Sequence, residues 1–117
     1  MTAGREASRR SGGASPPRHE LPAIDDAGLA AARAADRLLA AARDSGMERW
    51  VRFLEPLPDR LRDDGLAALR STALRARAAY GPKDSIRDSL PADLTEPLLE
   101  SIDRLLRLIA RHQTRGD

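Results

Sequence analysis

The sequence predicts an all-α protein: a small bundle of three main helices plus one short helix, preceded by a disordered N-terminal tail. Large apolar residues recur at steps of three and four in several segments, which is the period of one face of a helix. Gly and Pro mark the ends of these segments, at Gly46, Pro56 and Gly81. No segment alternates apolar and polar residues with β-branched enrichment, so we predict no sheet.

The tail is expected to span residues 1–23, and the helical bundle domain residues 24–114. The tail is rich in Ser, Gly, Pro and Arg and has almost no apolar surface to bury. Residues 1–20 contain four arginines and two glutamates, an excess of +2 that equals the formal net charge of the whole chain. The rest of the chain is therefore neutral, which argues against nucleic acid or an anionic membrane as the main partner of the domain.

The first helix of the domain is expected to begin at Asp25 or Asp26, either of which can cap it, and to end at Gly46. One face of this helix is formed by small residues and one leucine: Ala31, Ala35, Leu38 and Ala42. Such a face lets another helix approach closely but removes little area from water. We therefore expect this helix to be the least firmly docked element.

The short helix, residues 47–55, carries the largest side chains. Trp50, Phe53, Leu54 and Leu57 lie at positions i, i+3, i+4 and i+7. We favour a role for Trp50 and Phe53 in the core, because large apolar residues are scarce in this chain. The alternative is an exposed anchor for a partner, since Trp is enriched in binding hot spots. Under this alternative, Trp50 and Phe53 are candidate interface residues.

The third helix is expected within residues 58–80. Its apolar face is formed by Leu66, Leu69, Ala73, Ala76 and Tyr80, at steps of three and four. Gly65 follows two aspartates and indicates a restart of the helix after a single turn. Gly81 and Pro82 are a strong stop signal.

The last helix, residues 93–113, has the clearest apolar face, formed by Leu98, Ile102, Leu105 and Ile109. We expect Thr95 to be its N-cap and Pro97 to lie in its first turn. Its arginines at positions 104, 107, 111 and 115 form a basic stripe. We favour a solvated face paired with Glu100 and Asp103, although Arg104, Arg107 and Arg111 are also candidate contacts for a partner or for phosphates.

Five polar residues crowd into the loop of residues 81–91: Lys83, Asp84, Ser85, Arg87 and Asp88. The favoured interpretation is structural, because Ser85 to Asp88 fits the S-x-x-D pattern that caps a short helical turn. A small anion site remains open, since Lys83 is the only lysine in an arginine-rich chain. A nucleophile and base pair of Ser85 and Lys83 is the least favoured alternative.

The sequence indicates a non-catalytic protein. It has no cysteine, no histidine pair at metal-ligand spacing and no cofactor-binding motif, so we predict no metal, no cofactor and no enzyme activity. No apolar run has membrane-spanning length, and a cytoplasmic location is expected.

Leu, Ile, Val and Phe number only 23 of 117 residues, a light core that favours help from a protein partner or a second copy. The expected function is an interaction or regulatory protein acting through an apolar helix face or self-association. The alternative is a nucleic-acid-associated accessory protein that uses the basic tail and the C-terminal arginine stripe.

Overall fold

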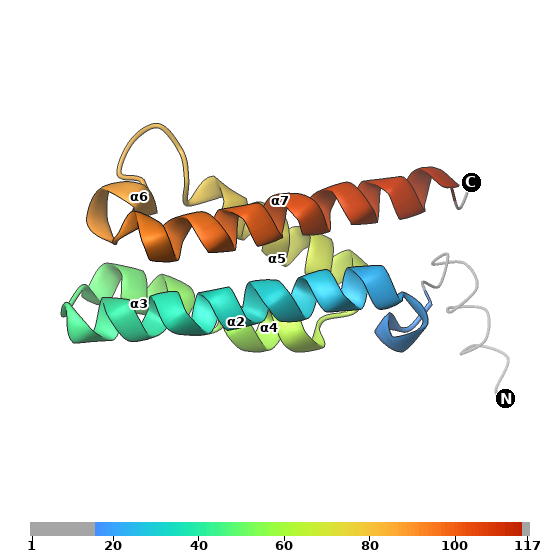
Figure 1. The fold of residues 1–117 in the computed structure, drawn as a ribbon, viewed down its shortest axis with the longest axis horizontal. Helices are drawn as coiled ribbons and strands as arrows, with labels where there is room; N and C mark the ends of the chain where they lie inside the picture. The colour runs from blue at the N-terminus through green and yellow to red at the C-terminus, as the bar shows by residue number, and fades with distance from the viewer. Residues whose placement is uncertain (1–15, 116–117) are drawn as a thin grey trace, which may run out of the picture.

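The computed structural model describes residues 16–115, and these residues contain helices and no strand (Figure 1). The all-α class is therefore confirmed. The elements in chain order are the 3-10 turn η1 (Arg18–Glu20) and the helices α2 (Pro22–Asp44), α3 (Glu48–Leu54), α4 (Leu57–Asp63), α5 (Leu66–Ala78), α6 (Ile86–Ser89) and α7 (Ala92–Arg115). The part of the expected tail that spans residues 1–15 lies outside the described residues.

The two longest helices, α2 and α7, lie side by side and run in opposite directions, so the start of α2 is beside the end of α7 (Figure 1). Helices α3 and α4 pack on α2, and α5 packs on α7. The expectation that α2 is loosely docked was wrong, because three other helices pack against it. Its small residues explain this arrangement: Ala31, Ala35, Leu38 and Ala42 have no exposed surface, so neighbouring helices approach its backbone closely.

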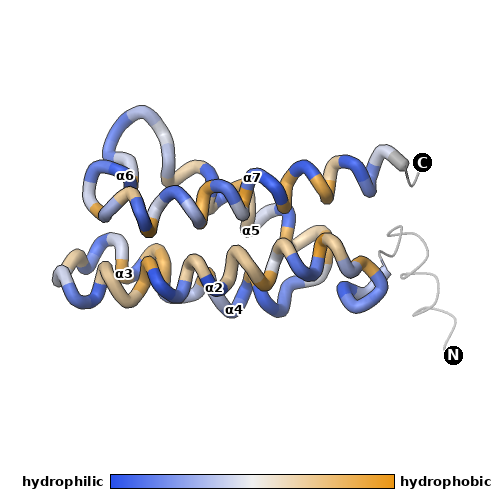
Figure 2. Tube along the Cα trace, viewed as in Figure 1, coloured by the Kyte–Doolittle hydropathy of each residue, from blue (hydrophilic) through white to orange (hydrophobic). Residues whose placement is uncertain are grey.

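The core lies between these helices and is built mainly from leucine and isoleucine. Among the largest fully buried side chains are Leu38, Leu61, Leu69, Ile102 and Leu105. Each such side chain stabilises the fold by about 1.5–3 kcal/mol relative to an exposed position. Figure 2 shows apolar and polar stretches alternating along α2 and α7, as one-sided burial requires.

The N-terminal boundary of the domain lies earlier than the sequence suggested. Helix α2 begins at Pro22, whose missing N–H costs nothing in a first turn. Asp25 is not a cap, because its carboxylate accepts a hydrogen bond of 2.9 Å from Arg18 Nε. Arg18 was assigned to the tail, yet it is part of the folded domain.

The segment of residues 58–80 restarts at Gly65, as predicted. The part before Gly65 is the seven-residue helix α4 rather than a single turn. Gly65 is the N-cap of α5, and the neighbouring Asp64 carboxylate accepts a hydrogen bond of 2.8 Å from the Thr72 hydroxyl. This contact links the α4–α5 junction to the second turn of α5.

The predicted start of the last helix was wrong. Helix α7 begins at Ala92, and the Pro91 carbonyl accepts from the Leu94 and Thr95 amides at 3.0 and 2.9 Å. Thr95 is therefore inside the helix and fully buried, and Pro97 lies beyond the first turn. The Thr95 carbonyl also accepts a hydrogen bond of 2.5 Å from the buried Tyr80 hydroxyl, which joins the segment after α5 to this turn of α7.

Candidate functional site

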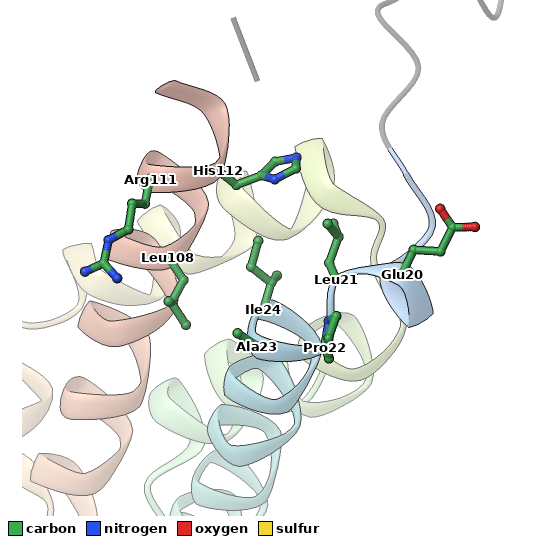
Figure 3. Close-up of a pocket in the computed structure, with 8 residues that line it drawn as sticks. All are labelled: Glu20, Leu21, Pro22, Ala23, Ile24, Leu108, Arg111 and His112. Atoms are coloured by element: carbon green, nitrogen blue, oxygen red, sulfur yellow. The ribbon is translucent and has the colours of Figure 1, made fainter. Parts of the chain in front are cut away.

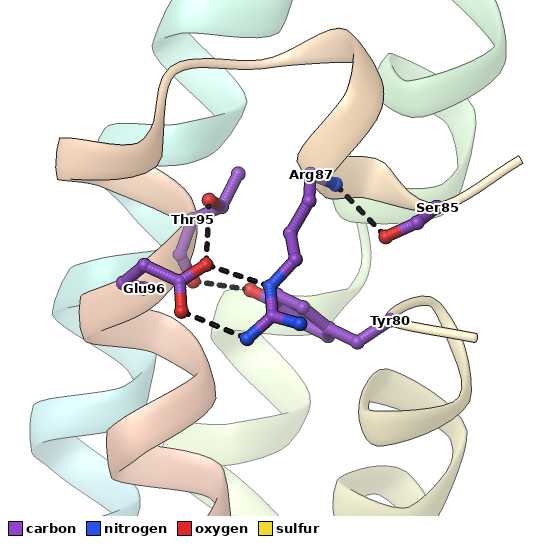
Figure 4. Close-up of polar contacts among 5 residues, drawn as sticks. All are labelled: Tyr80, Ser85, Arg87, Thr95 and Glu96. Carbon is purple, nitrogen blue, oxygen red and sulfur yellow. Dashed lines mark hydrogen bonds and ion pairs between the residues drawn. The ribbon is translucent and has the colours of Figure 1, made fainter. Parts of the chain in front are cut away.

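The loop of residues 81–91 contains the predicted capped turn. Ser85 is only 6% exposed, and its hydroxyl oxygen accepts a hydrogen bond of 3.1 Å from the Arg87 amide at the start of α6 (Figure 4). No hydrogen bond between Ser85 and Lys83 is found in the part of the chain that the structure describes. The capping interpretation of Ser85 is therefore confirmed, and its hydroxyl serves the fold.

Arg87 ties this turn to α7. Its Nε and Nη2 donate to the two carboxylate oxygens of Glu96 at 2.8 and 2.9 Å, and its guanidinium carbon lies 5.6 Å from the centre of the Tyr80 ring (Figure 4). The Thr95 hydroxyl donates to the same carboxylate at 3.3 Å. A two-pronged contact of this kind is the strongest that Arg makes with a carboxylate. We call these four residues, Tyr80, Arg87, Thr95 and Glu96, the Tyr80 clamp.

Burial and neighbouring charges shift the pKa of three groups in the Tyr80 clamp. Burial raises the pKa of the Tyr80 phenol, and the nearby Glu96 charge raises it further. The hydrogen bond with Glu96 raises the pKa of Arg87, and the same bond holds the pKa of Glu96 below its usual range. Perturbed groups often mark reactive sites, but here each perturbing contact also joins the loop to α7. The guanidinium of Arg87 is therefore already paired with a carboxylate of the fold.

The two charged residues at the start of the loop are not part of the Tyr80 clamp. Lys83 and Asp84 are exposed and line a depression of about 320 Å³ together with residues of α3 and α5. We call this depression the basic groove; its polar and aromatic lining residues are Arg49, Trp50, Phe53, Arg75, Lys83 and Asp84. The fold thus brings the candidate interface residues Trp50 and Phe53 together with part of the candidate loop. Asp88, the remaining loop candidate, is exposed and does not line the groove.

The base of the basic groove is apolar and its rim is charged. Trp50 is 6% exposed and Phe53 half-buried, with their rings perpendicular and 5.8 Å apart. The Arg49 guanidinium carbon lies 4.7 Å from the centre of the Trp50 ring, a cation–π contact. The structure therefore supports the core role of Trp50, while Phe53 reaches the surface of the groove.

The positive charges of the basic groove are not neutralised by the fold. Three cationic residues, Arg49, Arg75 and Lys83, face one carboxylate, that of Asp84. None of the three forms an ion pair with another described residue. Arg43 and Arg77, by contrast, pair with Glu55 and Asp103 on neighbouring elements. The local excess of positive charge can therefore act on a bound group.

The chain matches no protein-family model, no curated protein and no solved structure. Within residues 16–115, none of the helices combines the length and the apolar character that spanning a bilayer requires. Nor do the side chains in this range place three or more His, Asp or Glu groups where they could hold a metal ion.

The arginine stripe of α7 is a separate surface. Arg104, Arg107 and Arg111 are exposed and form no ion pair within the described range. The predicted pairing with Asp103 was wrong, because that carboxylate accepts a hydrogen bond of 2.8 Å from Arg77 on α5. The side chain of Arg115 lies outside the described residues.

A second depression, of about 330 Å³, lies where α2 begins and α7 ends (Figure 3). Leu21, Ile24 and Leu108 provide its apolar side chains, and His112 lies at its edge. Sequence reasoning did not find this depression, since it forms only when the two helices run antiparallel. Figure 3 shows the Arg111 guanidinium directed away from it, so the depression has little charge to select a ligand.

Proposed function

We propose that this is a non-catalytic helical interaction protein that binds its partner on the basic groove. The observation that carries the proposal is that three cationic side chains without an ion pair among the described residues, from α3, α5 and the loop after α5, line one depression together with the partly exposed Phe53 ring. Arginine and aromatic residues are the side chains most enriched at protein interfaces.

The distribution of apolar surface supports the groove over an apolar helix face. Leu74 of α5, at 43% exposure, is the one large hydrophobic side chain that is exposed in the described part of the chain. The apolar faces that sequence analysis favoured as contacts are used in the core. Of the Ser85 and Lys83 pair that was considered for catalysis, Ser85 instead caps α6. Arg87, which was considered for an anion site, belongs to the Tyr80 clamp.

The test is partner capture from the native host with three forms of the tagged chain: wild type, Arg49→Glu/Lys83→Glu and Arg33→Glu/Arg37→Glu. The control pair has the same change in charge and lies on exposed positions of α2 that form no ion pair with the described residues. We expect a nuclease-resistant protein partner that wild type and control retain and the groove variant loses, both in the lysate and with purified components. Equal retention by all three forms would contradict the proposal.

A second candidate function is association with nucleic acid through the arginine stripe of α7. The observation in its favour is that Arg104, Arg107 and Arg111 are exposed and have no carboxylate partner in the described range. Binding to a nucleic acid should weaken steeply with salt and should weaken further in Arg107→Glu/Arg111→Glu. Affinity that is independent of salt, or unchanged in this variant, would remove the candidate. Self-association and a cytoplasmic location stay predictions.

A further inference from the structure

We infer that the basic groove recognises an acidic protein segment in which carboxylates flank an apolar side chain. The inference rests on the proposed function and names the chemistry of the partner. It follows from three features of the groove: its charge, the orientation of its aromatic rings and its size.

The charge of the groove is positive on a neutral body. Outside residues 1–20 the chain has as many acidic as basic side chains, so the excess at the groove is local rather than a property of the whole surface. Arg49 and Arg75 each present a planar fork that matches a carboxylate, and Lys83 adds a compact charge. Such a cluster selects an anionic partner and raises its rate of encounter.

The aromatic rings favour a peptide over a single-stranded nucleic acid. Binding of single strands relies on ring faces on which bases stack. The Trp50 ring offers no such face, because it is largely buried and the Arg49 guanidinium lies over it. Phe53 is half-buried, and beside it the groove is lined by Ala78 and Ala79, so this surface suits an aliphatic side chain.

The size of the groove favours a linear segment. Its volume of about 320 Å³ is near the lower end for ligand sites, about 300–1,000 Å³. It therefore accommodates a few side chains at a time, which a short linear segment can provide. An extended or helical acidic segment can place one aliphatic residue on Phe53 and carboxylates on the surrounding cations.

Trp50 provides a direct measurement, because it is the only tryptophan of the chain and lies at the groove. We would titrate the full chain with a capped dodecapeptide of repeating Glu-Glu-Leu and follow the Trp50 emission. The matched probes are a Gln-Gln-Leu dodecapeptide and an oligothymidylate of the same length. We expect saturable binding of the Glu peptide that weakens as salt rises, and at least tenfold weaker binding of both other probes.

Two variants with opposite expected effects test the site. Arg75→Glu/Lys83→Glu should weaken binding of the Glu peptide at least tenfold, and both positions are exposed, so the fold should persist. Asp84→Asn removes the one carboxylate of the groove and should tighten binding about two- to fivefold. Asn also tolerates the left-handed backbone of residue 84, whose φ is 51°. The Arg33→Glu/Arg37→Glu control should bind as wild type does.

Several results would overturn the inference: equal binding of the Gln peptide, tighter binding of the oligothymidylate, or unchanged affinity in Arg75→Glu/Lys83→Glu. Failure of the inference can be distinguished from failure of the proposed function. If a native partner depends on the groove but the Glu peptide does not bind, the function stands and the partner chemistry is wrong. If native capture ignores the groove, the function itself is wrong.

Discussion

Replacing Gly28 of α2 with alanine should destabilise the protein, although alanine is the better helix former. Within a helix the exchange normally gains about 0.8–1 kcal/mol. At this position, however, an added Cβ would lie 2.5 Å from Nη2 of Arg18 and 3.0 Å from the Leu61 carbonyl oxygen. The first distance is too short for any contact, and the second involves backbone of α4 that cannot rotate away. Gly28 therefore provides the space through which Arg18 reaches α4.

The size of the effect follows from the contacts of Arg18. This side chain, 9% exposed, donates to the Leu61 and Asp64 carbonyls at 2.7 and 3.1 Å and so satisfies the C-terminal end of α4. Loss of one charge-assisted hydrogen bond costs about 1.5–3 kcal/mol. After the helix propensity is subtracted, Gly28→Ala should lower the free energy of unfolding by about 0.5–2 kcal/mol. The Tm should fall by roughly 2–16 °C.

The assay is urea and thermal unfolding followed by far-UV circular dichroism. Gly65→Ala is a comparison without a steric clash, because nothing lies within 4 Å of a Cβ there and φ is −71°. Since Gly65 is the N-cap of α5, where Gly is preferred to Ala, its expected cost is about 1 kcal/mol or less, and this cost should not depend on Arg18. In an Arg18→Ala background Gly28→Ala should cost less, so the double mutant should be non-additive. A stabilising Gly28→Ala, or strict additivity, would refute the reasoning.

Three further predictions use the same unfolding assay. Tyr80→Phe should lower the free energy of unfolding by about 0.5–1.5 kcal/mol. Burial raises the pKa of Tyr80 in the folded protein, so above about pH 10 only the unfolded chain loses this proton. Wild type should therefore lose stability as the pH rises above about 10, and the variant should lack this loss. Ser85→Ala should cost about 1 kcal/mol through the lost cap, whereas Ser71→Ala at an exposed site should be nearly neutral. Ile102→Ala in the core should cost about 2–5 kcal/mol, and a cost no larger than that of exposed Leu74→Ala would contradict the assigned packing.

The apolar face of each helix could be predicted from the sequence because helical periodicity is a local property. Leu98, Ile102, Leu105 and Ile109 were assigned to one face, and all four are buried. The first residue of the same helix was misplaced, because the position of a helix start is not fixed by local sequence alone. Thr95 has the chemistry of an N-cap, but it lies inside the helix, where it is fully buried and its hydroxyl donates to the Glu96 carboxylate. Only the tertiary fold reveals this burial.

Arg18 was beyond sequence reasoning. Its neighbours along the chain have the composition of a disordered tail, and two of its acceptors, the Leu61 and Asp64 carbonyls, are 43 and 46 residues away. Those acceptors are backbone atoms, so no side-chain pattern marks them. Gly28 was the one available signal, because an isolated glycine within a helix often has a packing reason.

The candidate site could be predicted only in parts. Trp50 and Phe53 were singled out by size, and Lys83 by being the only lysine, but nothing in the sequence placed these segments together. Arg49 and Arg75 were missed because arginine is so common in this chain that a single one carries no signal. What distinguishes them is position on the fold, where neither has a carboxylate partner among the described residues.

In the loop between α5 and α7, the residues with structural partners differ from those that line the basic groove. Ser85 caps the short helix α6 within the loop, and Arg87 attaches this turn to α7 through the Tyr80 clamp. Lys83 and Asp84, only a few residues earlier, are exposed and contribute to the groove instead. A light core needs such polar ties, because each junction between elements buries little apolar surface. The same ties fix the part of the loop that follows Lys83, and none of the clamp residues lines the basic groove.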